Sequence, residues 1–356
     1  MSFVSRRQFL STGVVIGATV SLSMSSLRAT AANDVVHLGF IGCGGRASNL
    51  LTAFSAIPGV VVSGLCDPDE SRLGAAGDRF PKAQRWRDLC GMLDDQSIDA
   101  AVISTCNHWH CLAAIWAMEA GKDVFVEKPL SHSQWEGQQT VAAARKFGRV
   151  CQLGTQQRSD PMQGEIKTFL HDEHALGKLQ MVRVNHYGVC LPIGRRETPM
   201  RFASNVDCNL WLGPAQDLPI YRDQLHYDWH FDFNTGSGDM GNWGIHILDD
   251  VRNNVFLDTI RLPKRVFGGG GRVAFKDAGN TPNLHFCYFD TGSIPVVIGL
   301  SNLTTGESSQ QEWKTKGPGT GYVVYGEGGR LDAFQRSEYR TVCRRWCRRG
   351  KPLPAT

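Results

Sequence analysis

The 356-residue sequence lacks both a long apolar run and a strong charge imbalance. Its most apolar N-terminal stretch, Val14 to Leu22, is short and interrupted by glycine and serine, which makes it too weak to span a membrane. The formal net charge is only +4, which gives no indication of a surface for nucleic acid or membrane. No internal repeat stands out. The apolar fraction of 42% and the charged fraction of 20% are typical of a globular protein.

The chain has 11 cysteines, an odd number, so they cannot all pair in disulfides within the chain. Several fall in expected core strands or helices, where an unpaired cysteine behaves as a small hydrophobic residue. These are Cys66, Cys106, Cys151 and Cys287. A domain of this size needs no disulfide to be stable. We therefore expect mostly reduced thiols, with Cys343 and Cys347 near the end of the chain as the exceptions.

The first 31 residues have the pattern of an export signal. Arg6 and Arg7 precede the weak apolar region, and Ala29-Thr30-Ala31 follows it as a cleavage site of the A-x-A type. We expect residues 1–31 to be a twin-arginine signal peptide that exports the folded protein to a periplasmic or other extracytoplasmic space. The alternative is an ordinary leader that contains two arginines by chance.

A glycine-rich turn follows the apolar run that begins at Val35. Gly42, Gly44 and Ala47 fit the pattern G-x-G-x-x-[GA], and a helical pattern begins at Ser48. The first glycine allows a tight turn, the second lets the backbone approach a pyrophosphate, and the small third residue lets helix and strand pack closely. The helix N-terminus then offers its N–H groups to the phosphates. The alternative is a glycine-rich turn that binds nothing.

Asp67 supplies the second half of a dinucleotide-binding fingerprint. The apolar run Val60 to Leu65 ends at Cys66-Asp67-Pro68, about 25 residues after Gly42. A carboxylate at that strand end accepts a hydrogen bond from the ribose 2′-hydroxyl of NAD. The same carboxylate repels the 2′-phosphate of NADP, so the sequence predicts NAD. Asp67 can alternatively be a turn residue before proline.

Strands and helices alternate as far as residue 155, which predicts a doubly wound parallel sheet. The later strands are expected at Asp99–Thr105, Asp123–Val126 and Val150–Leu153, and the helices at Leu112–Ala120 and Ser133–Phe147. Between them, Cys106 to His110 is interpreted as a loop. The carboxyl ends of parallel strands share one edge of the sheet, where ligands bind.

Beyond Thr155 the pattern changes to longer alternating segments, which predict a mostly antiparallel, open sheet. The expected strands are Gln180–Val189, Lys264–Phe275, Asn283–Phe289, Pro295–Leu300 and Gly321–Tyr325, with helices at Pro161–Leu176 and Asp239–Val255. The fold class is therefore α/β, with a Rossmann domain at 32–155 and an α+β domain for substrate and oligomerisation at 156–330. An atypical basic tail fills 331–356.

Two constellations suit hydride-transfer chemistry. Lys128, in Glu127-Lys128-Pro129, ends a strand on the ligand edge, where a lysine can stabilise charge that develops on a reacting hydroxyl. Asn242, His246 and Asp249 share one helix face. His246 can take the hydroxyl proton, because an imidazole titrates near neutral pH, and Asn242 or Asp250 can orient its ring. Alternatively, Glu127 and Lys128 form a surface ion pair, and His246 only caps or packs the helix.

Other polar segments are candidates for the substrate. Gln157 and Arg158 lie in a segment that can line the cleft, and Trp229 and His230 offer a stacking face and hydrogen-bonding groups suited to a sugar. Alternatively, Gln157 and Arg158 only form a strand-to-helix loop, and Trp229 and His230 only supply core packing and polar groups at the surface. The run Cys106–Cys111 contains two histidines, but its spacing matches no common structural zinc site, so we predict no metal.

Six motifs in a fixed order resemble the glucose–fructose oxidoreductase/inositol dehydrogenase (Gfo/Idh/MocA) family, and specifically its exported twin-arginine branch. They are Gly42–Arg46, Asn107–His110, Gly121–Pro129, Gly154–Arg158, Trp211–Pro214 and Gly238–Asp249. The resemblance covers about residues 35 to 330. It implies that Lys128 lies at the nicotinamide and substrate, and that His246 is the helix histidine.

The same resemblance implies that Asn107 and His110 lie under the nicotinamide ribose. Gly45, Arg46, Thr105 and Glu127 complete the predicted cofactor-binding set. Asn242 departs from the family pattern, since many members have aspartate there, and this leaves the acid/base assignment open. The arginine- and proline-rich end after Leu331 also departs from it.

The sequence therefore predicts an NAD-dependent oxidoreductase that transfers hydride at a CH–OH carbon of a sugar, polyol or sugar derivative. An NAD-using, redox-neutral glycosidase and a non-catalytic NAD-binding relative remain as alternatives. The expected partners are a small carbohydrate-type substrate and further copies of the chain, with no nucleic acid and no membrane.

Overall fold

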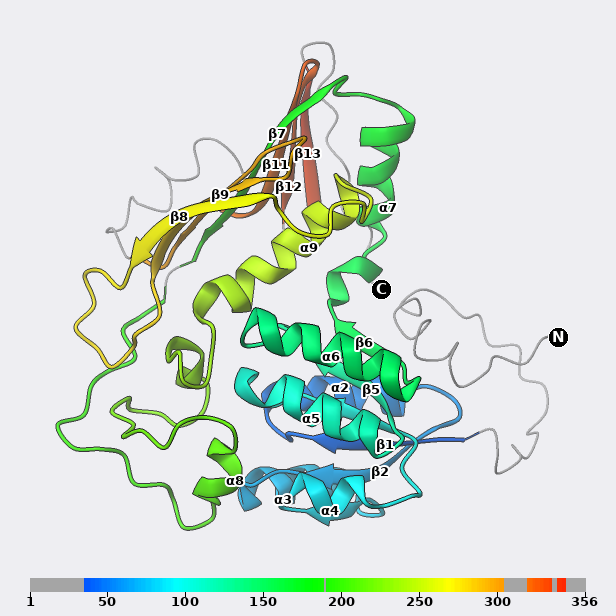
Figure 1. Ribbon diagram of the computed structural model, residues 1–356, viewed down its shortest axis with the longest axis vertical. Coiled ribbons are helices and arrows are strands. Elements are labelled where there is room, and N and C mark those ends of the chain that lie inside the picture. Colours follow the sequence, from blue (N-terminus) through cyan, green and yellow to red (C-terminus); the bar gives the residue numbers. More distant parts are fainter. Residues whose placement is uncertain (1–34, 189, 304–318, 335–337, 344–356) are drawn as a thin grey trace. The chain divides into compact units, whose positions relative to one another are not determined.

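The computed structural model describes residues 35–188, 190–303, 319–334 and 338–343 (Figure 1). The expected signal peptide, Cys347 and the last part of the basic tail lie outside these residues. The chain forms two compact units. Of the described residues, the first unit comprises 35–154, 199–220 and 234–236, and the second comprises the others.

The first unit contains a six-stranded sheet in the order β3-β2-β1-β4-β5-β6, with every pair of neighbours parallel. This arrangement confirms the predicted Rossmann domain. Its strands are β1 (Val36–Ile41), β2 (Val60–Cys66), β3 (Gln84–Trp86), β4 (Ala100–Ile103), β5 (Asp123–Glu127) and β6 (Cys151–Gly154). Its helices are α2 (Gly45–Ser55), α3 (Glu70–Arg79), α4 (Leu89–Leu93), α5 (Asn107–Glu119), α6 (Gln134–Phe147) and α8 (Cys208–Leu212).

Strand β4 shows why this sheet forms from short apolar runs. Its four residues are all buried. Ala101 and Ile103 belong to an apolar cluster with α4, α5 and α6, whereas Ala100 and Val102 belong to a second cluster with α2 and α3. A strand covered on both faces is apolar at every position, as in other parallel sheets.

The expected loop at Cys106–His110 is wrong, because helix α5 already begins at Asn107. Cys106 is its extended N-cap residue. Three polar side chains of the first turn, Asn107, His108 and His110, are buried. A turn that buries polar residues on several sides has no apolar stripe, and the sequence pattern therefore did not indicate a helix.

The second unit contains a seven-stranded sheet in the order β13-β12-β11-β7-β10-β9-β8. Only the β10–β7 pair is parallel, which confirms the predicted mostly antiparallel sheet. The strands are β7 (Leu179–Tyr187), β8 (Arg265–Gly271), β9 (Leu284–Asp290), β10 (Val296–Ser301), β11 (Thr320–Gly326), β12 (Gly329–Phe334) and β13 (Glu338–Cys343). The helical segments are η2 (Gln156–Ser159), α7 (Met162–Lys167), η3 (Thr168–Asp172), η4 (Asp228–Phe231), η5 (Met240–Gly244) and α9 (Ile245–Asn254).

Helix α9 covers one face of this sheet (Figure 1). Ile247 and Val251 pack with Val184 of β7 and Ile298 of β10 in one apolar cluster, which also takes side chains from α7 and η3. Burial of this stripe fixes α9 against the strands, because apolar area removed from water is the dominant favourable term in folding. The catalytic candidates on α9 are thereby attached to a rigid support.

Two expected boundaries in this unit differ from the structure. The helix expected over Pro161–Leu176 is α7 continued by the π-helical η3, and it ends at Asp172. The expected tail from residue 331 begins inside β12, where Leu331 and Ala333 are buried in the core. Alternation of these apolar residues with Asp332 is a strand pattern that the basic residues further on obscured.

Two further expectations concern cysteines and membrane spans. Described cysteines such as Cys43, Cys66, Cys111 and Cys151 carry reduced thiols, as expected. Within the described part of the chain, we found no helix with the length and apolar character needed to cross a bilayer.

Candidate functional site

The turn between β1 and α2 is shaped to hold a phosphate. Gly42 has φ +86°, and a Cβ there would lie 2.8 Å from the Ser104 carbonyl oxygen, so only glycine fits. Gly44 is the N-cap residue of α2, and no side chain caps the first turn. A Cβ on Gly45 would meet nothing within 4 Å, so open space lies beside it. Uncapped N–H groups beside open space fit the pyrophosphate of a dinucleotide.

Asp67 lies directly after β2 and is buried. Its Oδ2 accepts a hydrogen bond from the Cys43 N–H at 2.7 Å, and its Oδ1 accepts one from the Asp69 N–H at 2.9 Å. Burial raises the pKa of this carboxyl above its usual value. Each carboxylate oxygen retains a second lone pair that can accept from a ribose hydroxyl. Arg72 lies beside Gly44, 3.8 Å from Asp69.

Arg46 and Glu127, both predicted to bind the cofactor, contact each other. The Arg46 Nε lies 2.7 Å from the Oε1 of the buried Glu127 carboxylate. The other oxygen of Glu127 accepts from the Lys128 backbone N–H at 3.2 Å. This ion pair links the first turn of α2 to the end of β5, where Lys128 precedes Pro129. The partly buried Lys128 is thus placed on the same strand edge as the glycine turn.

His110 is buried and bridges the segments that follow β4 and β5. Its Nδ1 lies 2.6 Å from the Pro129 carbonyl oxygen, and its Nε2 lies 3.1 Å from the Thr105 carbonyl oxygen. Burial lowers the pKa of the ring, which favours the neutral form. These contacts give His110 a positioning role at the predicted nicotinamide end of the site.

His108 makes equivalent contacts within the first unit. Its ring nitrogens lie 3.2 Å from the Thr235 carbonyl oxygen and 3.2 Å from the Trp211 carbonyl oxygen. Burial lowers its pKa to about 4. In the described residues, no group of three or more His, Cys, Asp or Glu side chains is placed to hold a metal ion.

Asn242 and His246 come from a helix with an unusual start. Asn242 lies in the π-helical turn η5, and the buried His246 lies in the first turn of α9. π-Helical turns inside helices frequently occur at functional sites. Trp243 stacks on His186 of β7 with ring centroids 4.8 Å apart and planes at 17°. This contact holds the π turn against the sheet.

Asp239, just before η5, anchors the same turn. Its carboxylate is buried and accepts a hydrogen bond from the amide of Asn302, beyond the end of β10. Sequence reasoning missed Asp239, Trp243 and His186. Asp239 and Trp243 could have been noticed because they flank Asn242 in a glycine-rich segment of the sequence.

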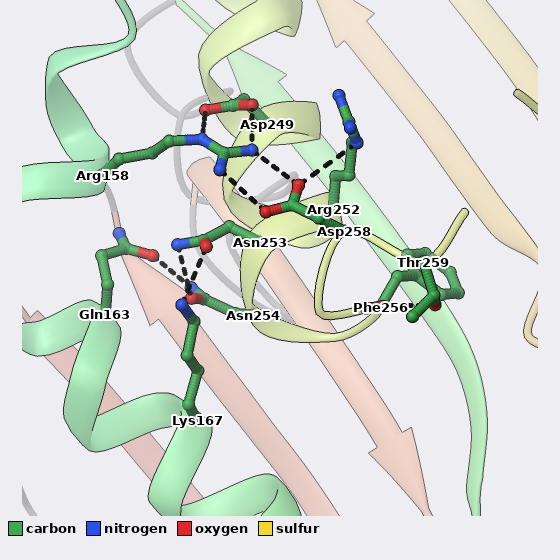
Figure 2. A network of polar contacts seen from close by, with 10 residues as sticks. All are labelled: Arg158, Gln163, Lys167, Asp249, Arg252, Asn253, Asn254, Phe256, Asp258 and Thr259. Carbon is green, nitrogen blue, oxygen red and sulfur yellow. Dashed lines mark hydrogen bonds and ion pairs between the residues drawn. The ribbon is translucent and has the colours of Figure 1, made fainter. Parts of the chain in front are cut away.

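Arg158 and Asp249, both predicted to bind substrate, form an ion pair with each other (Figure 2). Nε and Nη2 of Arg158 donate to the two carboxylate oxygens of Asp249 at 2.6 and 2.7 Å. Nη1 and Nη2 also donate to Asp258 at 2.9 Å each. This geometry ties η2 to α9 and gives both residues a structural role. Their predicted contact with substrate stays a prediction.

The polar network continues along α9 (Figure 2). Asn254 donates to Gln163 and, at 2.8 Å, to the Tyr322 hydroxyl, while Lys167 donates to Asn253 at 2.8 Å. Asp250 is buried beside this network, and burial together with the charge of Asp249 raises its pKa to about 8. Asp250 is therefore largely protonated at neutral pH.

The remaining substrate candidates lie elsewhere in the second unit. The Oε1 atom of Gln157 is shielded from solvent and has no hydrogen-bond partner in the described part of the chain. Trp229 and His230 stack in η4 with ring centroids 3.6 Å apart and planes at 20°. The predicted catalytic residues thus come from both units: Lys128 from the first, Asn242 and His246 from the second.

The fold and the glycine turn define a class, namely proteins with an NAD-binding Rossmann domain. Residues 36–155 match the family model described as "Oxidoreductase family, NAD-binding Rossmann fold" (GFO_IDH_MocA). The Rossmann domain of this chain is therefore similar to that of the Gfo/Idh/MocA oxidoreductase family.

Curated relatives match less than half of this chain. Inositol 2-dehydrogenase 2 of Saccharopolyspora erythraea is 31% identical over 159 residues, which cover 44% of this chain and 47% of the relative. A glycosyl hydrolase family 109 protein of Solibacter usitatus is 31% identical over 176 residues, which cover 42% of this chain and 39% of the relative. The chain thus matches less than half the length of each relative.

Solved structures extend the similarity of fold to both units. The WlbA dehydrogenase of Bordetella pertussis, in complex with NADH and UDP-GlcNAcA, is similar with a TM-score of 0.63 and 19% identity. The alignment covers 83% of this chain and 77% of that protein. At this identity the similarity concerns the fold.

Proposed function

We propose that this protein is an NAD-dependent oxidoreductase that acts on a CH–OH carbon of a sugar, polyol or sugar derivative. The observation that carries the proposal is the glycine turn with its uncapped helix N-terminus, placed beside Asp67 in a domain similar to that of the Gfo/Idh/MocA family. The substrate class is supported by the names of the relatives, an inositol dehydrogenase and a dehydrogenase solved with UDP-GlcNAcA.

In the proposed reaction, each group of residues has its own role. The N–H groups at the start of α2 hold the pyrophosphate, and Asp67 accepts from a ribose hydroxyl. NAD bound there would supply the hydride acceptor. His246 takes the proton of the reacting hydroxyl on its imidazole, and Lys128 stabilises the negative charge that develops on the oxygen. Asp239 and Trp243 position the turn that carries Asn242.

The test is a turnover screen of the purified protein with NAD⁺ or NADP⁺. The panel contains myo-inositol, free hexoses and 4-nitrophenyl glycosides. We expect a free sugar or polyol to give net formation of reduced nicotinamide, and tighter binding of NAD than of NADP. Cofactor binding without turnover of either substrate type would indicate a non-catalytic relative.

The redox-neutral glycosidase is a second candidate, favoured by the similarity to glycosyl hydrolase family 109 proteins. It would release 4-nitrophenol without net formation of reduced nicotinamide. The same screen therefore separates the two activities.

We also infer export by the twin-arginine route. The support is the order of Arg6-Arg7, apolar region and Ala29-Thr30-Ala31 in the sequence. N-terminal sequencing of exported protein should give a start near Ala32, and material that retains residues 1–31 would contradict the inference.

A further inference from the structure

Tyr227 occupies a backbone conformation that tyrosine rarely adopts. Its φ is 69° and its ψ is −54°, and the Asp228 N–H donates to the His226 carbonyl oxygen at 3.0 Å. These values define a γ-turn with positive φ, which is rare and strained for a residue with a Cβ. Strained residues persist where the surrounding structure holds them, and they concentrate at ligand-binding and active sites.

Contacts to His230 hold the strained turn. The Tyr227 carbonyl oxygen accepts from the His230 backbone N–H at 3.1 Å and lies 2.6 Å from the His230 Nδ1. The two rings lie with centroids 5.1 Å apart, and His230 in turn stacks on Trp229. The turn therefore places three aromatic rings together on η4.

Core packing does not account for the strain. The Tyr227 side chain is 59% exposed, so the conformation directs its ring toward the surface. A turn that needs only positive φ is better served by glycine or asparagine. A tyrosine in this conformation therefore indicates that its exposed ring contacts a ligand.

Tyr227 also lies within electrostatic range of the start of the candidate catalytic helix. Partial burial and the nearby Cys190, Asp239 and Asp228 raise the pKa of its hydroxyl. Asp239 is the residue that anchors η5, the turn with Asn242. The aromatic group on η4 and the helix with His246 both belong to the second unit.

We propose that Tyr227 is a substrate-contacting residue that determines specificity, presenting its ring to the apolar face of a pyranose or cyclitol substrate next to the Trp229–His230 stack. The inference rests on the proposed function and names the side of the substrate site that selects the ring. Aromatic rings pack against the C–H face of a sugar, and the tyrosine hydroxyl can hydrogen-bond a substrate hydroxyl.

Three substitutions test this role. Tyr227→Gly removes the ring and relieves the strained φ, so we expect an equal or higher Tm together with a KM for the sugar raised about 10-fold or more. Tyr227→Phe keeps the ring and should raise KM less than Tyr227→Gly does. Trp135→Ala, which removes a 66% exposed ring on α6, is the matched control and should leave KM unchanged. The Kd for NAD should stay the same in all three variants.

If Tyr227 had only a structural role in the turn, Tyr227→Gly would not combine an equal or higher Tm with a higher KM for the sugar. If the wild type turns over a sugar and Tyr227→Gly retains its KM, the inference is overturned while the proposed function stands.

If no sugar is turned over, the proposed function fails, and the inference is decided by chemical protection. Tetranitromethane nitrates exposed tyrosines, and peptide mass spectrometry reports the modification at Tyr227. With NAD present, myo-inositol or a 4-nitrophenyl glycoside should protect Tyr227, which is 59% exposed, from nitration. Equal nitration of Tyr227 with and without these sugars would then overturn the inference.

Discussion

The Asp67 carboxylate accepts a hydrogen bond from the Cys43 N–H at 2.7 Å, and this contact joins the end of β2 to the glycine turn after β1. One side chain therefore does two things in the proposed site. It fixes the backbone that faces the pyrophosphate, and it offers an oxygen to the ribose. Its second oxygen similarly accepts from the Asp69 N–H, which starts α3.

This relationship leads to the first prediction. Asp67→Ser shortens the side chain and removes its negative charge. NAD affinity should fall by about 10- to 100-fold, because a charge-assisted hydrogen bond contributes about 1.5–3 kcal/mol. NADP affinity should fall less or rise, since the repulsion of the 2′-phosphate is gone. Titration of both dinucleotides checks this, and wild-type protein that binds NADP as tightly as NAD would contradict the assignment.

Asp250 should make the stability of the protein depend on pH. Its pKa is raised from 3.8 to about 8 in the folded state, so the folded state binds more protons than the unfolded state over this interval. The contribution of Asp250 is therefore present at low pH and lost as pH rises toward 8. Asp250→Asn keeps the group neutral, and its Tm relative to wild type should increase from pH 5 to pH 8. Asp172→Asn, at an exposed position, should show no such trend.

Arg158 should stabilise the second unit through its two carboxylate partners. Arg158→Ala leaves Asp249, whose side chain is 11% exposed, without its guanidinium, and should lower the free energy of unfolding by about 1–3 kcal/mol. The exposed Arg265–Asp290 pair serves as the control, and Arg265→Ala should lower the free energy of unfolding less than Arg158→Ala does, because solvent screens that pair. A KM for substrate that rises in Arg158→Lys while Tm stays at the wild-type value would instead support the predicted substrate contact.

An aromatic patch on β8 and β9 should mediate self-association. It comprises Phe267, Phe286 and Tyr288, which share one face of the sheet and are 58%, 64% and 41% exposed. Contiguous exposed apolar residues of this size mark interaction surfaces. We expect the wild type to be a homo-oligomer at micromolar concentration and Phe286→Glu to be a monomer by light scattering. Trp135→Glu should leave the mass unchanged, and a monomeric wild type would end the prediction.

The sequence predicted those parts of the site that are local along the chain. Gly42 and Asp67 were found because a Rossmann site uses residues at successive strand ends, whose spacing is nearly constant. The Arg158–Asp249 pair joins residues that are 91 positions apart, and only the packing of α9 on the sheet brings them together. The positive φ of Tyr227 left no signal, because tyrosine is not a residue that favours it.

The final prediction concerns the two residues proposed for the chemical step. Lys128 follows β5 in the first unit, and His246 lies in the first turn of α9 in the second. Lys128→Ala and His246→Ala should each lower kcat by about 10²- to 10⁴-fold, the range for a charge-stabilising donor or a general base. The Kd for NAD should change little in His246→Ala. The exposed Lys178 and His174 offer the controls Lys178→Ala and His174→Asn, which should keep wild-type kcat.

Asn242 gives this prediction a second, independent readout. An anionic neighbour raises the pKa of an imidazole, so the base form of His246 becomes available only at higher pH. In Asn242→Asp, the acidic limb of the profile of kcat/KM against pH should therefore move to higher pH. It should stay in place in Asn242→Ser, which adds no charge. Near-normal turnover of both Lys128→Ala and His246→Ala on a verified substrate would disprove the mechanism. An acidic limb that does not move in Asn242→Asp would exclude Asn242 as a neighbour of the proton-accepting ring.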